Sequence, residues 1–298
     1  MTLEEAIVEV YESTDEQSDL DPYVSGTMSL TTTGATRIMG LLNRAQDAIA
    51  TWKFPNGRRL RFRCLEDTAV VTMTVPTYNA VSDSTDGIVT FAGGFDGTGN
   101  AYAGWIALHD DSPYVIVGSN VDSITIAGPT LPVVTAADAV KLTKQYWSLK
   151  GDGADVTMPW RLIEVVEMYD IGNDMPLSVG LSRDRGAMTT LGAGDVGEWV
   201  NAQKGVRFDV APDATVHFIV RGYRYPTAVA ALSDAFEIPE AFHEAICEYA
   251  KYTANSRIGK IDNAAMAWAR CEKLMFSLRT EDDIESDFLE GRMYVEGV

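Results

Sequence analysis

Hydrophobic residues at helical spacing occur only towards the two ends of the chain. Thr2 and Glu5 have the spacing of a capping box, which predicts a short first helix that continues to about Tyr11. A second helix is predicted over residues 33–52, because apolar residues recur there every three or four positions with polar residues between them. These apolar residues are Ile38, Leu41, Leu42, Ala45, Ile49 and Trp52.

Two further helices are predicted near the C-terminus. Pro239 suits the first position of a helix that continues to about Arg257, and Gly259 interrupts the pattern. Asp262 can then cap a last helix that runs to about Leu278. A turn of a few residues joins the two, so we expect an antiparallel helical hairpin.

Between residues 58 and 225 the pattern changes to short alternating or β-branched runs, separated by Gly, Asp, Ser and Pro. Such runs are typical of antiparallel sandwiches and barrel-like modules. Residues 136–146 are the exception, because their pattern is locally helical. The expected strands cover residues 59–64, 70–75, 88–91, 104–108, 114–117, 123–126, 161–169 and 215–223.

The elements together predict an α+β protein. A helical bundle formed by the N- and C-terminal segments is expected to carry a large antiparallel β-rich insertion. The predicted domains are a helical domain (1–57 and 226–280), a β-rich insertion domain (58–225) and an acidic C-terminal tail (281–298). The 298 residues are 46% hydrophobic, which is enough to build a sizeable core.

The net charge of −19 changes the picture of possible partners. A free-standing nucleic-acid-binding protein is expected to be basic. Residues 1–25 hold eight acids and no base, and residues 281–298 hold seven acids and one base. The ends therefore act either as solvated segments or as surfaces that face a particular partner. The last segment also contains Phe288, Leu289 and Tyr294, and we expect it to dock on a neighbouring protein.

One local basic cluster opposes this acidic balance. It consists of Arg58, Arg59, Arg61 and Arg63. On a strand, the last three would share one face, because side chains alternate with a period of two. The face could meet phosphate or an acidic protein, or it could simply be solvated. No aromatic residues interleave with it in the manner of nucleic-acid-binding surfaces, which favours a protein partner.

The sequence predicts no catalytic residue, cofactor or metal. The three cysteines, Cys64, Cys247 and Cys271, are far apart and lack the spacing of metal ligands. The glycines of residues 192–197 fit G-x-G-x-x-G, but neither the strand before them nor the helix after them is predicted. Asp96, Thr98 and Asn100 resemble the start of a calcium loop without its glycine and final glutamate.

Two stretches resemble the head-to-tail adaptor proteins of tailed bacteriophages, including the tail tubular protein A group. The first is Thr-Gly-Ala-Thr-Arg-Ile-Met-Gly-Leu-Leu-Asn-Arg-Ala-Gln-Asp at 33–47, leading into Trp52 and the arginine strand. The second is Tyr-Arg-Tyr-Pro at 223–226, followed by Ser-Asp-Ala-Phe-Glu-Ile-Pro-Glu-Ala-Phe-His-Glu-Ala-Ile at 233–246. The order of an early helix, a β-rich insertion and a late helix also matches the family.

The resemblance implies a ring of subunits, typically twelve, below the portal at the exit of the capsid. Such a ring has no catalytic residues. It binds other copies of itself, the portal protein and a tail or nozzle protein, and it lets double-stranded DNA pass without specific binding. The implied location is the neck of the virion, after synthesis in the host cytoplasm. No signal peptide and no apolar run of membrane-spanning length is recognisable.

Two other classes of function stay open. A ligand- or carbohydrate-binding β-sandwich of the virion, or another structural tail component, would need exposed aromatic residues. The candidates are Tyr78, Tyr102, Trp105, Tyr114, Trp147 and Trp160. A hydrolase could use His109, which Asp110 and Asp111 could orient, or His243. A packing or surface role is the favoured interpretation of both histidines.

Overall fold

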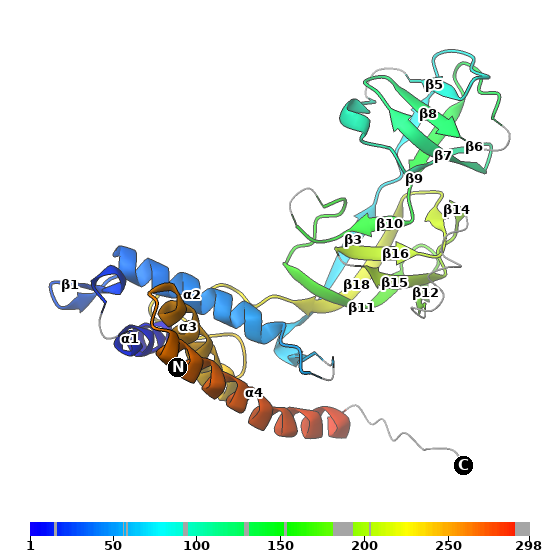
Figure 1. Ribbon diagram of the computed structural model, residues 1–298. Helices are drawn as coiled ribbons and strands as arrows, with labels where there is room; N and C mark the ends of the chain where they lie inside the picture. Colours follow the sequence, from blue (N-terminus) through cyan, green and yellow to red (C-terminus); the bar gives the residue numbers. More distant parts are fainter. Residues whose placement is uncertain are drawn as a thin grey trace. The chain divides into compact units, whose positions relative to one another are not determined.

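The computed structural model divides the chain into two compact units (Figure 1). Unit 1 comprises Met1–Glu66 and Tyr225–Val298, and unit 2 comprises Asp67–Arg224. The structure describes residues 1–14, 17–55, 57, 59–91, 95–127, 131–151, 154–180, 193–202 and 204–289, with side chains described as far as residue 278.

The fold class predicted from the sequence is wrong. The protein is mostly β-sheet, with 34% strand and 29% helix, so it is not a helical bundle that carries an insertion. The described residues form four helices, and one of the sheets curls into a half-barrel. Helical periodicity is conspicuous over long segments, whereas strands of two to five residues each carry little pattern, so the sequence analysis gave the helices too much weight.

Unit 1 begins with α1 (Leu3–Ser13), and its predicted capping box is confirmed. The backbone N–H of Thr2 donates to Glu5 Oε2 at 2.8 Å, and the backbone N–H of Glu5 donates to Thr2 Oγ1 at 3.3 Å. Helix α2 (Thr33–Ala50) starts where Thr32 Oγ1 accepts the backbone N–H of Ala35 at 3.0 Å. The short pieces between them are η1 (Ser18–Leu20), β1 (Tyr23–Val24) and β2 (Thr27–Met28).

The predicted helical hairpin is also present in unit 1. It consists of α3 (His243–Arg257), which follows η5 (Glu240–Phe242), and α4 (Ile261–Leu289). Gly259 adopts a φ of 79° in the turn between α3 and α4, a conformation that favours glycine. Helix α3 packs against α1, α2 and α4. With 29 residues against 15, α4 is roughly 20 Å longer than α3 at about 1.5 Å per residue.

Two four-stranded sheets of unit 2 share one hydrophobic core. One sheet has the order β12-β11-β18-β3 and the other β10-β16-β15-β13. The large buried side chains of the core are Trp147, Met168, Trp199, Phe208 and Phe218. The strands are β3 (Glu66–Met73), β10 (Tyr146–Ser148), β11 (Leu162–Asp170), β12 (Met175–Pro176), β13 (Ser178–Val179), β15 (Glu198–Ala202), β16 (Gly205–Phe208) and β18 (Val216–Arg224).

The half-barrel is the six-stranded sheet of unit 2, with the order β4-β9-β6-β7-β8-β5 and a core of its own. Residues 136–146, whose pattern is locally helical, instead form β9 between β4 and β6, because long-range pairing overrides local propensity. The strands are β4 (Thr77–Asn79), β5 (Ile88–Thr90), β6 (Ile106–His109), β7 (Ser112–Ser119), β8 (Ser123–Ala127) and β9 (Ala139–Thr143).

A parallel pair of short strands, β14 (Ala193–Gly194) and β17 (Ala211–Pro212), completes the described sheets of unit 2. Ala211 packs with Ile106 and Leu108 of β6, and Thr143 Oγ1 donates to the carbonyl of Pro212 at 2.6 Å. Within the described part of the chain, no helix has both the length and the apolar character that crossing a membrane requires.

Candidate functional site

The two stretches that resemble phage adaptors are held together in unit 1 by side chains of α2. Asn43 Nδ2 donates to the carbonyl of Val229 at 3.1 Å, and the backbone N–H of Val229 donates to Asn43 Oδ1 at 2.9 Å. A carboxamide that bonds one residue in both directions fixes the position of that backbone segment. The pair therefore anchors the segment between β18 and α3 on the surface of α2.

Gln46, one helical turn later, makes a second pair of bonds of this kind. Its Nε2 donates to the carbonyl of Thr227 at 3.0 Å, and its Oε1 accepts the backbone N–H of Glu237 at 3.2 Å. The backbone N–H of Thr227 in turn donates to Glu237 Oε2 at 2.8 Å. Gln46 is 1% exposed, so each of these hydrogen bonds replaces a hydrogen bond to water that is lost on burial. We call Asn43, Gln46, Thr227, Val229 and Glu237 the clasp.

His243 has a packing role at the start of α3. Its side chain is buried, and its Nε2 donates to the carbonyl of Ile238 at 2.7 Å. The ring stands nearly edge-on to Phe236, with 5.3 Å between the ring centroids. The histidine of the second adaptor-like stretch thus fixes the turn that leads into α3.

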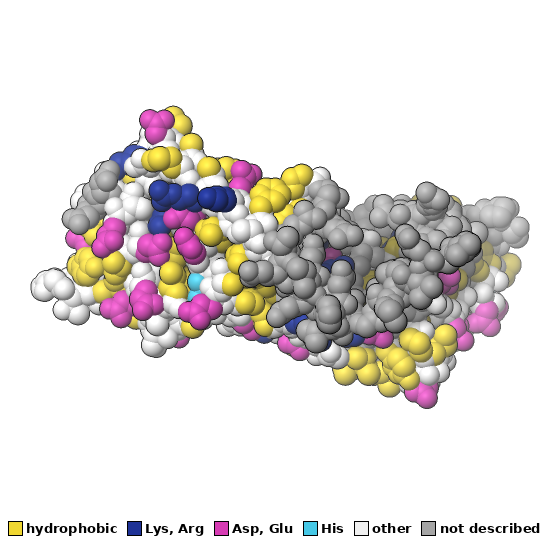
Figure 2. All heavy atoms as spheres, turned by 90° about the horizontal axis from the view of Figure 1, so that it is seen from below, with side chains coloured by type: hydrophobic (Ala, Val, Ile, Leu, Met, Phe, Trp, Pro, Cys, Tyr) yellow, Lys and Arg dark blue, Asp and Glu magenta, His cyan; other side chains and the backbone are white. Residues whose placement is uncertain are grey.

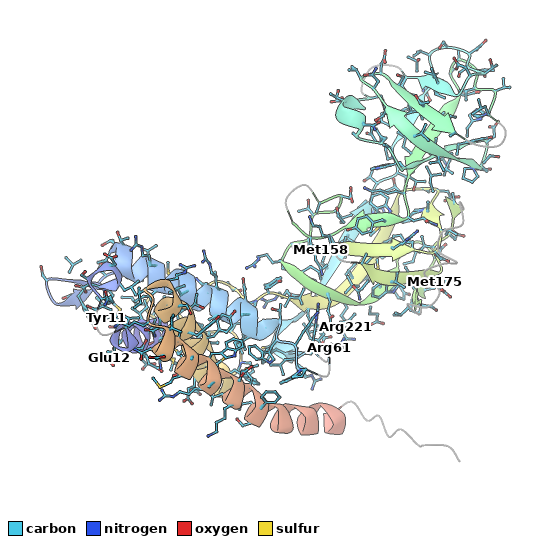
Figure 3. The ribbon with its side chains drawn as sticks, viewed as in Figure 1. Tyr11, Glu12, Arg61, Met158, Met175 and Arg221 are labelled. Carbon is cyan, nitrogen blue, oxygen red and sulfur yellow. The ribbon has the colours of Figure 1, made fainter. Side chains whose placement is uncertain are left out.

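The arginine segment does not form the predicted strand. Arg59 makes an isolated antiparallel bridge with Lys53, and Arg63 begins the 3-10 helix η2 (Arg63–Leu65). Arg59, Arg61 and Arg63 are nevertheless all exposed, and Figure 3 shows Arg61 on the segment that follows α2. Arg58 lies outside the described residues.

The apolar residues of the arginine segment explain why its arginines face outward. Leu60, Phe62 and Leu65 are buried, and Phe62 meets Phe242 edge to face with 4.9 Å between the ring centroids. Burying these side chains stabilises one orientation of the segment even without a strand ladder.

An aromatic groove lies beside the start of this segment, within unit 1. Its cavity volume is about 410 Å³. Trp268 of α4 lies 5.7 Å from Trp52 and 5.1 Å from Tyr252, measured between ring centroids. Phe276, at the other end, is 46% exposed. The groove is lined by Ala48, Thr51, Trp52, Lys53, Pro55, Tyr249, Trp268, Glu272 and Phe276.

The groove could not be predicted from the sequence, because its aromatic residues come from three separate segments and fit the helical pattern of core positions. A large aromatic residue at each of these positions is the only signal that could have indicated it.

Figure 2 shows acidic side chains spread over the face it displays, among apolar ones, and not collected in one patch.

The predicted interface residues of the tail are placed only in part. Phe288 and Leu289 lie in the last turn of α4, and their side chains lie outside the described residues. Tyr294 lies outside the described residues altogether.

His109 is oriented by a carboxylate other than those expected. Its side chain is 8% exposed, and its Nε2 lies 3.1 Å from Asp138 Oδ2, whereas Asp110 Oδ2 is 3.8 Å from its Nδ1. Asp138 Oδ2 also accepts the backbone N–H of Thr135 at 2.7 Å. Hydrogen bonds from Thr135 and then from His109 lower the pKa of Asp138. The contact joins the end of β6 to the start of β9.

The calcium-like residues stabilise a loop. Asp96 Oδ1 accepts the backbone N–H of Thr98 at 3.0 Å, and Asn100 Oδ1 accepts that of Ser119 at 2.7 Å. In the part of the chain that the structure describes, no three His, Cys, Asp or Glu residues come together in a way that could hold a metal ion.

The glycine-rich stretch has a strand where a phosphate-binding loop would need a helix. Gly194 belongs to β14, and the chain continues from Gly197 into β15. Gly192 lies outside the described residues.

The aromatic residues that a glycan-binding sheet would need are used inside unit 2. Trp147 is 2% exposed, and Trp160 packs against the same core. The other four pack, partly buried, against the core of the half-barrel: Tyr78, Tyr102, Trp105 and Tyr114.

Lys144 further covers Trp105, because its Nζ lies 4.2 Å from the ring centroid and pairs with Asp155. Burial would raise the pKa of Asp155, but hydrogen bonds from Lys144 and Ser148 outweigh burial and lower it.

Comparison of the sequence with protein-family models and with curated proteins finds no match.

Proposed function

We propose that this chain is a structural protein of a tailed-phage virion. In this proposal it is a head-to-tail adaptor, which forms a ring below the portal, joins the capsid to the tail and lets the genome pass. Its partners are other copies of itself, the portal protein and a tail or nozzle protein.

The clasp is the observation that carries the proposal. The resemblance lies in two stretches that are more than 170 residues apart. Gln46 of the first bonds Glu237 of the second, and Asn43 and Gln46 also bond Val229 and Thr227, which lie between the two parts of the second stretch. Polar side chains that are fully bonded to a backbone segment make that segment rigid. This role suits a protein whose task is to hold a fixed shape within an assembly.

Unit 1 also offers surfaces suited to neighbouring proteins. The arginine segment presents exposed guanidinium groups, and the groove presents aromatic side chains beside Lys53. Aromatic residues and arginine are enriched at protein interfaces, where they contribute much of the binding energy.

The test is particle imaging and native mass spectrometry of the purified full chain, alone and mixed with the portal ring of the same phage. We expect a closed ring of the chain on the portal. Monomers under both conditions would contradict the proposal. Arg63→Glu should weaken capture by the portal, whereas Lys204→Glu, which changes an exposed lysine of unit 2, should not.

A further inference from the structure

We propose that the aromatic groove of unit 1 receives the end of α4 and the following acidic tail from a neighbouring copy of the chain, with Phe288 and Leu289 as apolar anchors. The inference deepens the proposed function, and rests on it, by naming the contact that links one subunit to the next.

The charges of the two segments are complementary. Residues 51–64, a segment whose first residues line the groove, contain five basic residues and no acid. Residues 281–290 contain six acids and no base. Complementary charge steers such segments together and disfavours contact between two like segments. In the lining of the groove itself, Lys53 carries one of these positive charges and Glu272 carries a negative charge.

The chemistry of the groove also suits this occupant. An aromatic cavity of about 410 Å³ holds one or two large apolar side chains. Helices that bind in grooves use apolar anchors three or four positions apart. Ile284 and Phe288 have this spacing within α4, and Leu289 follows directly.

Helix geometry assigns the occupant to a neighbour. Phe276 borders the groove, and α4 continues without interruption from there to Leu289. The twelve residues from Phe276 to Phe288 rise by roughly 18 Å at about 1.5 Å each. Phe288 therefore cannot enter the groove of its own subunit while α4 stays helical. A contact from the tail of one copy to the groove of the next is heterologous, and repeated contacts of this kind generate rings.

The test is cross-linking with a zero-length carbodiimide, which joins Lys53 to carboxylates of the tail. It is done in a mixture of unlabelled and ¹⁵N-labelled full chain, with portal present. We expect peptides that join Lys53 of one isotope to Asp287 or Glu290 of the other. Phe276→Ala and Phe288→Ala should each lower the yield by about tenfold, as loss of an interface anchor does. Met266→Ala is the matched control, because Met266 is 55% exposed on α4 but does not line the groove.

Cross-links confined to one isotope, or a yield that Phe276→Ala leaves unchanged, would overturn the proposal. Portal capture, measured on the same samples, separates this outcome from failure of the adaptor function. Capture without mixed cross-links rejects the groove contact and keeps the adaptor. Mixed cross-links that Phe276→Ala abolishes, without capture, reject the adaptor and keep the contact between copies.

Discussion

Replacing Lys251 with methionine should destabilise unit 1 strongly. Lys251 Nζ lies 2.6 Å from Glu9 Oε1 and 2.7 Å from Glu248 Oε1. The side chain of Glu248 is 5% exposed, that of Lys251 13% and that of Glu9 34%. Burial lowers the pKa of Lys251, but hydrogen bonds to Glu248 and Glu9 outweigh burial and raise it. The ammonium group is therefore charged and bridges α3 to α1.

The two ion pairs do not contribute equally. A pair with a partly exposed partner is worth about 0–1 kcal/mol, which is the share expected for Glu9. Removing one partner of a buried pair costs about 3–5 kcal/mol, because the other charge is left in a poorly solvated site. Lys251→Met leaves the buried carboxylate of Glu248 without its charged partner. We therefore expect a loss of about 3–5 kcal/mol in the free energy of unfolding of unit 1.

Urea denaturation at pH 7, followed by amide hydrogen exchange in α3, measures this loss for unit 1 alone. The double variant Lys251→Met/Glu248→Gln should recover most of the stability. Lys273→Met, at an exposed position of α4, is the control. A change below about 0.5 kcal/mol in Lys251→Met would refute the reasoning, because it would show that the pair is solvated.

Four other substitutions test the cores. Met275→Ala should cost about 2–5 kcal/mol in chemical denaturation, and more than Leu274→Ala, because Met275 is fully buried and Leu274 is only partly so. Gly205→Ala should lower the melting temperature of unit 2, because a Cβ there would lie 1.9 Å from the carbonyl oxygen of Trp147. Burial raises the pKa of Cys271 from 9.0 to about 12, so the unfolded chain ionises first and stability should fall as the pH rises from 9 to 12. Cys271→Ala should make that fall shallower in urea titrations at each pH.

The helices of unit 1 could be predicted because their signals are local. The reciprocal bonds of Thr2 and Glu5 begin α1, and Gly259 forms the turn between α3 and α4. Each of these interactions connects residues within a few positions of one another. The predicted helices match the structure to within a few residues, except that α4 continues eleven residues past its predicted end near Leu278, to Leu289.

The errors arise where distant segments decide the structure. Residues 59–64 alternate like a strand, but among the described residues they make only one bridge, between Arg59 and Lys53, and no ladder. Residues 136–146 have helical propensity, but pairing with β4 and β6 makes them a strand. The groove likewise forms only after α2, α3 and α4 have packed. The residue pattern within one segment does not record these contacts between distant segments.

The clasp and the groove also explain what the adaptor resemblance can and cannot predict. Every residue of the clasp except Thr227 and Val229 lies within the two resembling stretches, whereas the residues that line the groove, apart from Trp52, lie outside them. The resemblance thus concerns residues that set the shape of unit 1. The groove that would select a neighbour is built mainly from residues to which the resemblance does not extend. Substitutions in the clasp should therefore report on folding, and only substitutions in the groove and the arginine segment can discriminate between an adaptor ring and another use of the same fold.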